Sequence, residues 1–274
     1  MGKLARSLGL VENWHPIESA HVATLFSGTI DLKIKTLLAS YANIILFSLS
    51  PELEQTIHQI TTKPVCRITP KPPEDVPIHL TKFVLENLIT YGLIKKTDVV
   101  VESLSLDHRR GETQSSDKVL LHPGAGSLRK RWPISNFFEV AARLEADGLQ
   151  PEFILGPAEA DLAEELQHPD RTVHVLSDLL ELTVLLKSVG GYIGNDSGAS
   201  HLAAVLGLPV TMIFGPADPK RWAPVGRNVS IVRPELDCRP CFETEKANCG
   251  DPECLTKTTP QQVIRAFYRE DGGF

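Results

Sequence analysis

The stretch G-Y-I-G-N-D-S-G-A-S-H-L-A-A-V-L-G-L-P-V-T-M-I-F, residues 191–214, predicts two strands of a parallel sheet and the helix that joins them. Its apolar residues form short runs at 192–194 and 209–214, and small residues fill 199–206 between them. A helix that starts directly after a strand leaves its first N–H groups without backbone partners. These donors and the positive end of the helix dipole attract anions. We therefore expect a phosphate-binding turn here.

The residues of this turn suit that role. Ser197 can cap the helix, and Gly198 allows a ligand to approach the backbone. Asp196 and His201 are expected to face the same ligand. An ordinary strand–helix turn with a capping aspartate is the simpler interpretation, and the tetrapeptide alone does not exclude it.

Further strands and helices alternate on both sides of this stretch. Apolar runs predict strands at 43–48, 65–68, 118–121, 152–155, 172–175 and 229–232. A helix opens at Ser50-Pro51-Glu52-Leu53, with Ser50 as its cap. Further helical patterns fall at 79–91, at 136–146 after a Ser135 cap, at 159–167 and at 178–189. This alternation predicts an α/β fold with a parallel sheet covered on both faces. Ligands of such sheets bind beyond the carboxyl ends of the strands.

The chain is expected to form two domains. Residues 105–117 are polar and resemble a linker, so we predict an N-terminal domain at 1–112 and a C-terminal domain at 113–274. The C-terminal domain ends in a helix that opens with Thr259-Pro260-Gln261-Gln262, a capping-box pattern. The N-terminal part contains only about two strand–helix–strand steps.

Composition excludes several classes of function. The 274 residues are 42% hydrophobic, enough for a substantial core, and carry a formal charge of −6. An acidic chain is a poor general ligand for nucleic acid or an anionic membrane surface. No apolar run has the length of a membrane span, and the N-terminus lacks the apolar core of a signal peptide. We expect a cytoplasmic protein with no nucleic-acid partner and at most peripheral membrane contact.

A basic loop follows the strand at 118–121. Lys130 lies between Arg129 and Arg131, and Trp132-Pro133 follows. A lysine at a strand end can neutralise the charge that builds on a diphosphate leaving group. A solvated basic loop is the common alternative for an isolated run of this kind.

Four of the five cysteines cluster near the C-terminus as C-x2-C-x7-C-x4-C, from Cys238 and Cys241 to Cys249 and Cys254. The first pair has the spacing of zinc ligands, so a structural metal site is one interpretation. The later spacings are not those of a standard zinc module. We expect reduced, partly buried thiols without a tightly bound metal or disulfide.

Four motifs occur in a fixed order: H-P-G-A-G-S-L-R-K-R-W-P at 122–133, L-G-P-A-E at 155–159, G-N-D-S-G-A-S-H-L-A-A at 194–204, and F-G-P-A-D-P-K-R-W-A-P at 214–224. The series closely resembles glycosyltransferase family 9, the ADP-heptose:lipopolysaccharide heptosyltransferases. The resemblance is dense from about 118 to 263 and faint before that. It implies a GT-B fold with two Rossmann-like domains, of which the N-terminal one is incomplete here.

The resemblance also implies an activity. The C-terminal domain would bind an ADP-sugar donor, the N-terminal domain would bind the lipopolysaccharide-core acceptor, and heptose would transfer with inversion and without a metal or other cofactor. Lys130 matches the family's diphosphate-binding lysine, and we predict it as catalytic together with Asp196. The family's ribose-binding glutamate corresponds to Glu159, and the adenine would lie near Ser177. The predicted substrate-binding residues are Gly126, Ser127, Lys130, Glu159, Ser177, Asp196, Ser197, Gly198 and His201.

The N-terminus departs from the family pattern. The family opens with a strand and a leucine-glycine-aspartate loop that holds the proposed base, whereas Leu8-Gly9-Leu10 has no acid after the glycine. We therefore expect the first strands to be absent and transfer to be slow, which makes a nucleotide-sugar-binding remnant without turnover the alternative function. A GT-B sugar-nucleotide epimerase is a second rival. The sugar and the acceptor are not identified by the sequence.

Overall fold

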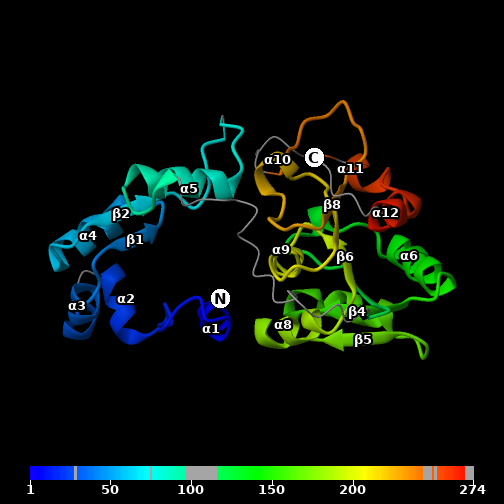
Figure 1. Ribbon diagram of the computed structural model, residues 1–274, viewed down its shortest axis with the longest axis horizontal. Coiled ribbons are helices and arrows are strands. Elements are labelled where there is room, and N and C mark those ends of the chain that lie inside the picture. The colour runs from blue at the N-terminus through cyan, green and yellow to red at the C-terminus, as the bar shows by residue number, and fades with distance from the viewer. Residues whose placement is uncertain (28–29, 75, 97–115, 243–248, 250–251, 269–274) are drawn as a thin grey trace. The chain divides into compact units, whose positions relative to one another are not determined.

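The computed structural model describes residues 1–27, 30–74, 76–96, 116–242, 249 and 252–268. The chain divides into two compact units, Met1–Val99 and Val100–Phe274 (Figure 1). The domain boundary predicted at 112/113 lies outside the described residues. Each unit is described by itself.

The N-terminal unit contains a strand–helix–strand step. Strands β1 (Ile44–Phe47) and β2 (Val65–Ile68) pair in parallel and are joined by α4 (Pro51–Ile60). Ser50 caps α4 by accepting a hydrogen bond from the Leu53 N–H, as predicted. The other helices of this unit are α1 (Gly2–Ser7), α2 (Ala20–Ser27), α3 (Leu32–Ala39) and α5 (Leu80–Thr90).

The C-terminal unit is built on a six-stranded sheet in the order β5-β4-β3-β6-β7-β8, and every neighbouring pair is parallel. The strands are β3 (Lys118–His122), β4 (Gln150–Leu155), β5 (Thr172–Val175), β6 (Gly191–Asn195), β7 (Val210–Ile213) and β8 (Val229–Val232). The strand order reverses between β3 and β6, which is the arrangement of a Rossmann domain. The predicted α/β class with parallel sheets is therefore confirmed.

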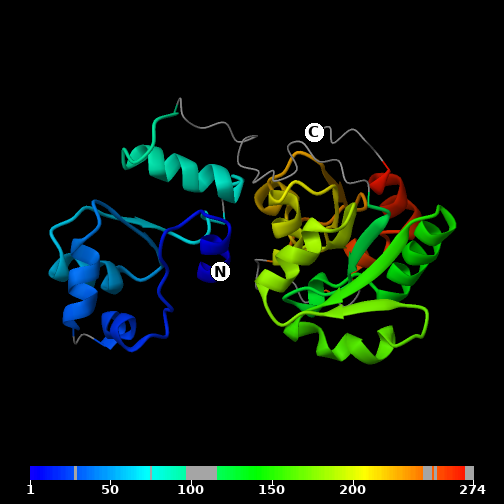
Figure 2. The same cartoon turned by 60° about the horizontal axis from the view of Figure 1, so that its bottom comes forward.

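Helices cover both faces of this sheet (Figures 1 and 2). On one face, α6 (Ile134–Ala146) and α12 (Pro260–Phe267) pack on alternate strand residues, among them Leu121, Phe153 and Ile193. On the other face, α9 (Gly198–Val205) contacts β6 and β7, and α8 (Leu179–Lys187) contacts α9. Because side chains alternate along a strand, each central strand is buried on both sides.

Two helix starts differ from the sequence prediction. Helix α6 begins at Ile134 with Pro133 at its cap, and not after Ser135, because the Pro133 carbonyl already accepts the Asn136 N–H. The segment predicted as one helix at 159–167 is a 3-10 helix, η4 (Pro157–Leu162), followed by α7 (Ala163–Leu166). Glu159 has non-helical backbone angles there because its carboxylate accepts the Gly156 N–H.

Short helices complete the C-terminal unit. They are η3 (Leu128–Lys130), α10 (Pro219–Trp222) and α11 (Glu253–Thr256). The capping box predicted at the last helix is present, since Thr259 and Gln262 accept each other's backbone N–H groups. None of the helices in the described part of the chain combines the length and apolar character that a bilayer crossing requires.

Candidate functional site

The candidate site lies where the strand order reverses. Strands β3 and β6 are parallel neighbours that end at His122 and Asn195, so the loops that follow them meet at one edge of the sheet. A pocket of about 360 Å³ opens at this point. Its lining residues are Gly126, Ser127, Lys130, Asp196, Ser197, Gly198, His201, Trp222 and Phe242.

The N-terminus of α9 forms one wall of the pocket. Ser197 is the cap residue, and its hydroxyl accepts the Ser200 N–H at 3.5 Å. A side chain at Gly198 would meet no atom within 4 Å, so the backbone of the first turn is open to a ligand. With unpaired N–H groups and the positive end of the helix dipole, this wall favours an anion.

The basic loop forms the opposite wall. Lys130 of η3 lines the pocket, and its Nζ lies 2.7 Å from Asp196 Oδ2. The Asp196 side chain is 6% exposed and that of Lys130 is 18% exposed, so little water screens this ion pair. The Lys130 ammonium also lies 4.1 Å from the centroid of the Phe242 ring. Both contacts restrain the lysine at the mouth of the α9 turn.

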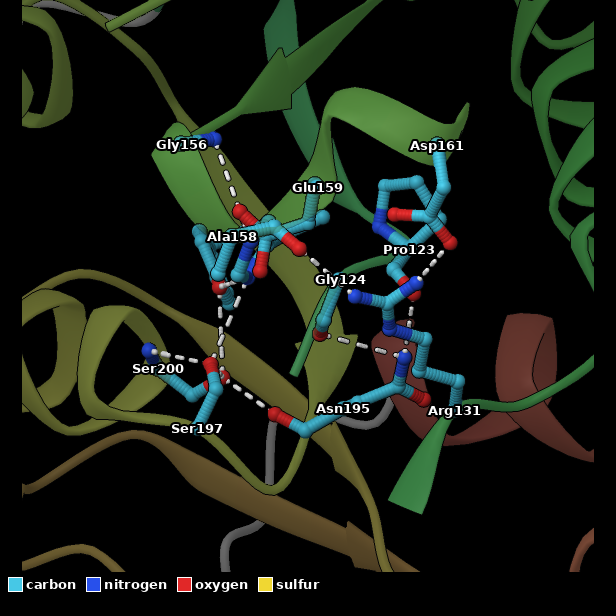
Figure 3. Close-up of polar contacts among 12 residues, drawn as sticks. Pro123, Gly124, Arg131, Gly156, Ala158, Glu159, Asp161, Asn195, Ser197 and Ser200 are labelled. Carbon is cyan, nitrogen blue, oxygen red and sulfur yellow. Dashed lines mark hydrogen bonds and ion pairs between the residues drawn. The ribbon is translucent and has the colours of Figure 1, made fainter. Parts of the chain in front are cut away.

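Asn195 fixes the basic loop to the sheet (Figure 3). Its buried side chain donates to the Pro123 carbonyl at 2.8 Å and accepts the Trp132 N–H at 3.1 Å. The indole of Trp132 is buried and donates to the Thr258 carbonyl at 2.9 Å. The loop that carries Lys130 is therefore held at both ends by one amide.

Arg131 is not among the pocket residues, and its side chain points to Asp161 (Figure 3). Its guanidinium forms an ion pair with Asp161 and donates to the Ala158 carbonyl at 2.9 Å, which ties the basic loop to η4. The loop therefore directs Lys130 into the pocket and uses Arg131 as a structural anchor. Asp161 serves as the partner of that arginine.

Glu159 is buried next to the pocket and does not line it. The side chain is 7% exposed, accepts the Gly156 N–H at 2.8 Å and packs against Gly124, where a Cβ would collide with it. The neighbouring His122 ring holds the pKa of Glu159 below its usual range, against the effect of burial.

His122 connects Glu159 to the α9 turn. Its Nε2 lies 3.9 Å from Glu159 Oε2, and its Nδ1 lies 3.1 Å from the Tyr192 hydroxyl and 3.3 Å from the Ser197 hydroxyl. The Ser200 hydroxyl lies 3.2 Å from that of Tyr192 and donates to the Asn195 carbonyl at 2.6 Å. A continuous polar network therefore runs beneath the pocket wall.

Seven of the nine residues predicted to bind substrate line this pocket, and two do not. Glu159 is directed at His122, and Ser177 is exposed after β5, where its hydroxyl donates to Glu181. Trp222, from the motif at 214–224, also lines the pocket. Phe242 was not predicted, because the only signal was an aromatic residue within the cysteine cluster.

The cysteine segment reaches the pocket through Phe242. The N–H groups of Cys241 and Phe242 both donate to the Pro216 carbonyl, which holds the phenyl ring over the basic loop. None of the five cysteines, all of which are described, forms a disulfide. Within the described residues no group of three or more His, Cys, Asp or Glu side chains could hold a metal. Burial raises the pKa of the Cys254 thiol, which favours its protonated form.

The fold and the pocket define a Rossmann-type domain with an anion-suited site at its switch point. Residues 82–250 match the sequence model of "Glycosyltransferase family 9 (heptosyltransferase)". The chain belongs to this family.

Curated relatives include lipooligosaccharide heptosyltransferase 2 of Campylobacter jejuni, 29% identical over 161 residues, which are 55% of this chain and 50% of that protein. Lipopolysaccharide heptosyltransferase 2 of Salmonella typhimurium is 27% identical over 166 residues, 56% of this chain and 47% of that protein. The chain spans about half the length of the curated relatives it matches.

Solved structures share the fold. A family 9 glycosyl transferase from Veillonella parvula superposes with a TM-score of 0.65 at 16% identity, covering 85% of this chain and 74% of the other. The E. coli heptosyltransferase WaaC with ADP gives a TM-score of 0.61 at 16% identity, covering 96% and 80%.

Proposed function

We propose that the chain is an inverting glycosyltransferase that transfers heptose from an ADP-sugar donor to the inner core of lipopolysaccharide. The donor would bind the C-terminal domain, and the acceptor would bind the N-terminal one. Family membership supports the reaction class, and one structural neighbour was solved with ADP. The proposed location is the cytoplasm, with at most peripheral membrane contact.

The observation that carries the proposal is the pairing of Lys130 with the α9 turn across one pocket. A diphosphate only accepts hydrogen bonds, and this pocket offers it an ammonium, a serine hydroxyl and unpaired backbone N–H groups. When the bond between the sugar and the diphosphate breaks, negative charge grows on the leaving oxygen. Preorganised donors at that position stabilise the charge more in the transition state than in the ground state.

Asp196 would have two roles in this reaction. In the ligand-free pocket its carboxylate neutralises Lys130 and holds it near the α9 turn. With a donor bound, the ammonium would turn to the diphosphate, and the carboxylate would accept a hydroxyl of the sugar. The exchange keeps Lys130 paired throughout, so a buried charge is never left alone.

The other residues predicted to contact the substrate would bind different parts of the donor. Gly126 and Ser127 would offer backbone and hydroxyl groups to the diphosphate, and His201 would contact the sugar or the phosphate from the first turn of α9. Ser177 lies after β5, on the side where the adenosine would extend. The proposal needs no metal or other cofactor, because Lys130 and the helix terminus supply the positive charge.

The test has two parts. Isothermal titration against ADP, UDP and GDP should show that ADP binds most tightly. Release of ADP from ADP-heptose should then depend on a heptose-deficient lipopolysaccharide acceptor. Tighter binding of UDP or GDP would refute the donor assignment. Binding of ADP-heptose without acceptor-dependent release would favour the alternative, a nucleotide-sugar-binding protein without turnover.

A further inference from the structure

An aromatic ring contacts the Lys130 ammonium at the pocket. Lys130 Nζ lies over the Phe242 ring, 4.1 Å from its centroid, and both residues line the pocket. A cation this close to a ring is attracted by the negative charge of the ring face. Only 18% of the lysine side chain is exposed, and such an attraction is stronger where water is excluded.

Contacts from two parts of the fold hold Phe242 in this place. The N–H groups of Cys241 and Phe242 donate to the Pro216 carbonyl, in the loop after β7, at 2.8 Å and 3.0 Å. The guanidinium carbon of Arg129 lies 5.6 Å from the centroid of the same ring, and Arg129 Nη2 donates to Cys241 Sγ at 3.7 Å. The ring is therefore tied both to the sheet and to η3, which carries Lys130.

The two partners of Lys130 have different effects on its charge. The Asp196 carboxylate lies 2.7 Å from Nζ and neutralises the ammonium. The Phe242 ring has no net charge, so it attracts the cation without neutralising it. When a diphosphate replaces Asp196 as the anionic partner, the ring can stay in contact with the lysine and leave its N–H groups to the phosphate oxygens.

We propose that Phe242 is a positioning residue that holds the Lys130 ammonium at the diphosphate site through a cation–π contact. This inference rests on the proposed function. A lysine side chain is long and flexible, and fixing it in one conformation costs entropy. Because the ring already restrains the ammonium in the ligand-free pocket, less of this cost arises when the donor binds. The ring acts through the lysine and needs no contact with the ligand.

The first experiment needs no ligand. Protons that lie over an aromatic ring resonate upfield, so the Cε protons of Lys130 should lie further upfield in the parent than in Phe242→Leu. NMR of protein labelled only at lysine measures the shift, and Lys130→Met identifies the signal by its loss. Equal shifts in the parent and in Phe242→Leu would mean that the ring does not lie over the ammonium in solution, and would overturn the inference.

The second experiment changes the charge of the ring face and little else. Phenylalanine with one, two or three fluorine atoms is incorporated at position 242, because each fluorine weakens the negative ring face while the side chain keeps nearly the same shape. ADP affinity should fall stepwise along the series, by about threefold to tenfold in total. A flat series would mean that the ring only packs, and a rising series would mean that a phosphate contacts the ring directly. Either result would overturn the inference.

The third experiment is a double-mutant cycle on the ADP dissociation constant. Phe242→Leu should weaken ADP binding about fivefold in the parent background and less than about twofold in Lys130→Met. The fluorinated series should likewise be flat in Lys130→Met. An equal loss of affinity in both backgrounds would mean that the ring acts independently of the lysine, which would refute the positioning role.

The matched control is Phe138 of α6. The guanidinium carbon of Arg171 lies over its ring at 3.9 Å from the centroid, and Phe138 is not among the pocket residues. Phe138→Leu removes a cation–π contact of the same kind and should leave ADP affinity unchanged. A loss as large as that in Phe242→Leu would mean a general effect of removing a ring from this domain, and would overturn the specific role of Phe242.

Inorganic pyrophosphate shows which part of the ligand is affected. Phe242→Leu should weaken pyrophosphate and ADP by the same factor, because both present phosphate groups to Lys130. A loss confined to ADP would mean that the ring contacts the nucleoside, and it would overturn the inference. If the parent binds neither probe, the proposed function fails and this inference fails with it. If the parent binds both and the Phe242 variants match it, only the inference about Phe242 fails.

Discussion

At the scale of single residues, the Lys130–Asp196 pair separates binding of the leaving group from handling of the sugar. The two side chains are 2.7 Å apart and poorly exposed, so removal of either leaves the other without its partner. The pair therefore predicts opposite effects on ADP affinity for the two substitutions.

Lys130→Ala should weaken ADP binding by about 1–3 kcal/mol and slow any transfer, because the diphosphate charge loses its cation. Asp196→Asn should keep or strengthen ADP binding, since Lys130 is no longer neutralised, yet slow transfer. Isothermal titration and an ADP-release assay measure the two effects. Lys187→Ala, an exposed lysine at the end of α8, is the control and should match the parent. ADP binding by Lys130→Ala at the affinity of the parent would refute the phosphate assignment.

Two glycines at the site predict different losses. A Cβ at Gly124 would collide with the buried Glu159 side chain, whereas a Cβ at Gly198 would enter open space. Gly124→Ala should lower the free energy of unfolding by about 1–3 kcal/mol. Gly198→Ala should keep stability but weaken ADP binding, because the methyl group occupies the approach to the helix N-terminus. Urea denaturation and titration with ADP separate the two outcomes, and the reverse pattern would contradict the proposed ligand position.

At the scale of elements, three neighbouring strands share a charge network that is centred on the buried Glu152 and lies away from the pocket. Glu152 of β4 lies 2.6 Å from Lys118 of β3 and 2.7 Å from His174 of β5. Burial alone would raise the pKa of Glu152, but the hydrogen bonds from Lys118 and His174 outweigh it and hold the pKa below its usual range.

A glutamate with a lowered folded-state pKa stabilises the fold above its unfolded pKa, and the contribution is lost as the pH falls through the folded value. Glu152→Gln should therefore destabilise the protein by about 1–2 kcal/mol at neutral pH. The difference from the parent should shrink below about pH 4, where glutamates protonate. Urea denaturation across pH tests this, with the exposed Glu145→Gln as control. A difference that does not depend on pH would argue against the ion-pair origin.

At the same scale, the cysteine segment at 238–254 contains four thiols of the kind that bind a structural metal. We predict no tightly bound metal, and elemental analysis of protein purified without a chelator measures it. About one zinc per chain, lost in Cys238→Ser, would overturn the prediction and indicate a structural site that helps to hold Phe242 over the pocket.

At the scale of the whole molecule, the two units should respond differently to the donor. Hydrogen exchange with and without ADP should show protection in the loop after β3 and in the first turn of α9. The amides of α4 and β2 in the N-terminal unit should exchange at unchanged rates, and they serve as the internal control. Protection confined to the N-terminal unit would refute the assignment of the donor to the C-terminal one.

Local sequence determined the strands, three of the helix caps and the lining of most of the pocket. The Ser50, Ser197 and Thr259 caps depend on contacts within three residues, so they follow from the sequence alone. The strand–turn–helix at 191–206 likewise fixed the position of the proposed anion-binding turn, because parallel strands bring their loops to one edge.

Only the tertiary structure decided which polar groups from distant parts of the sequence contact one another. His122 and Ser197 are 75 positions apart, and Lys118, Glu152 and His174 come from three strands, so no local pattern predicts their contacts. The direction of Glu159 depends on the same packing, because Gly124 leaves room for its carboxylate beside His122. Phe242 enters the pocket only because the Pro216 carbonyl holds its backbone there. Backbone patterns are local, whereas the pairing of buried polar groups depends on strand order and on the space that the neighbouring residues leave.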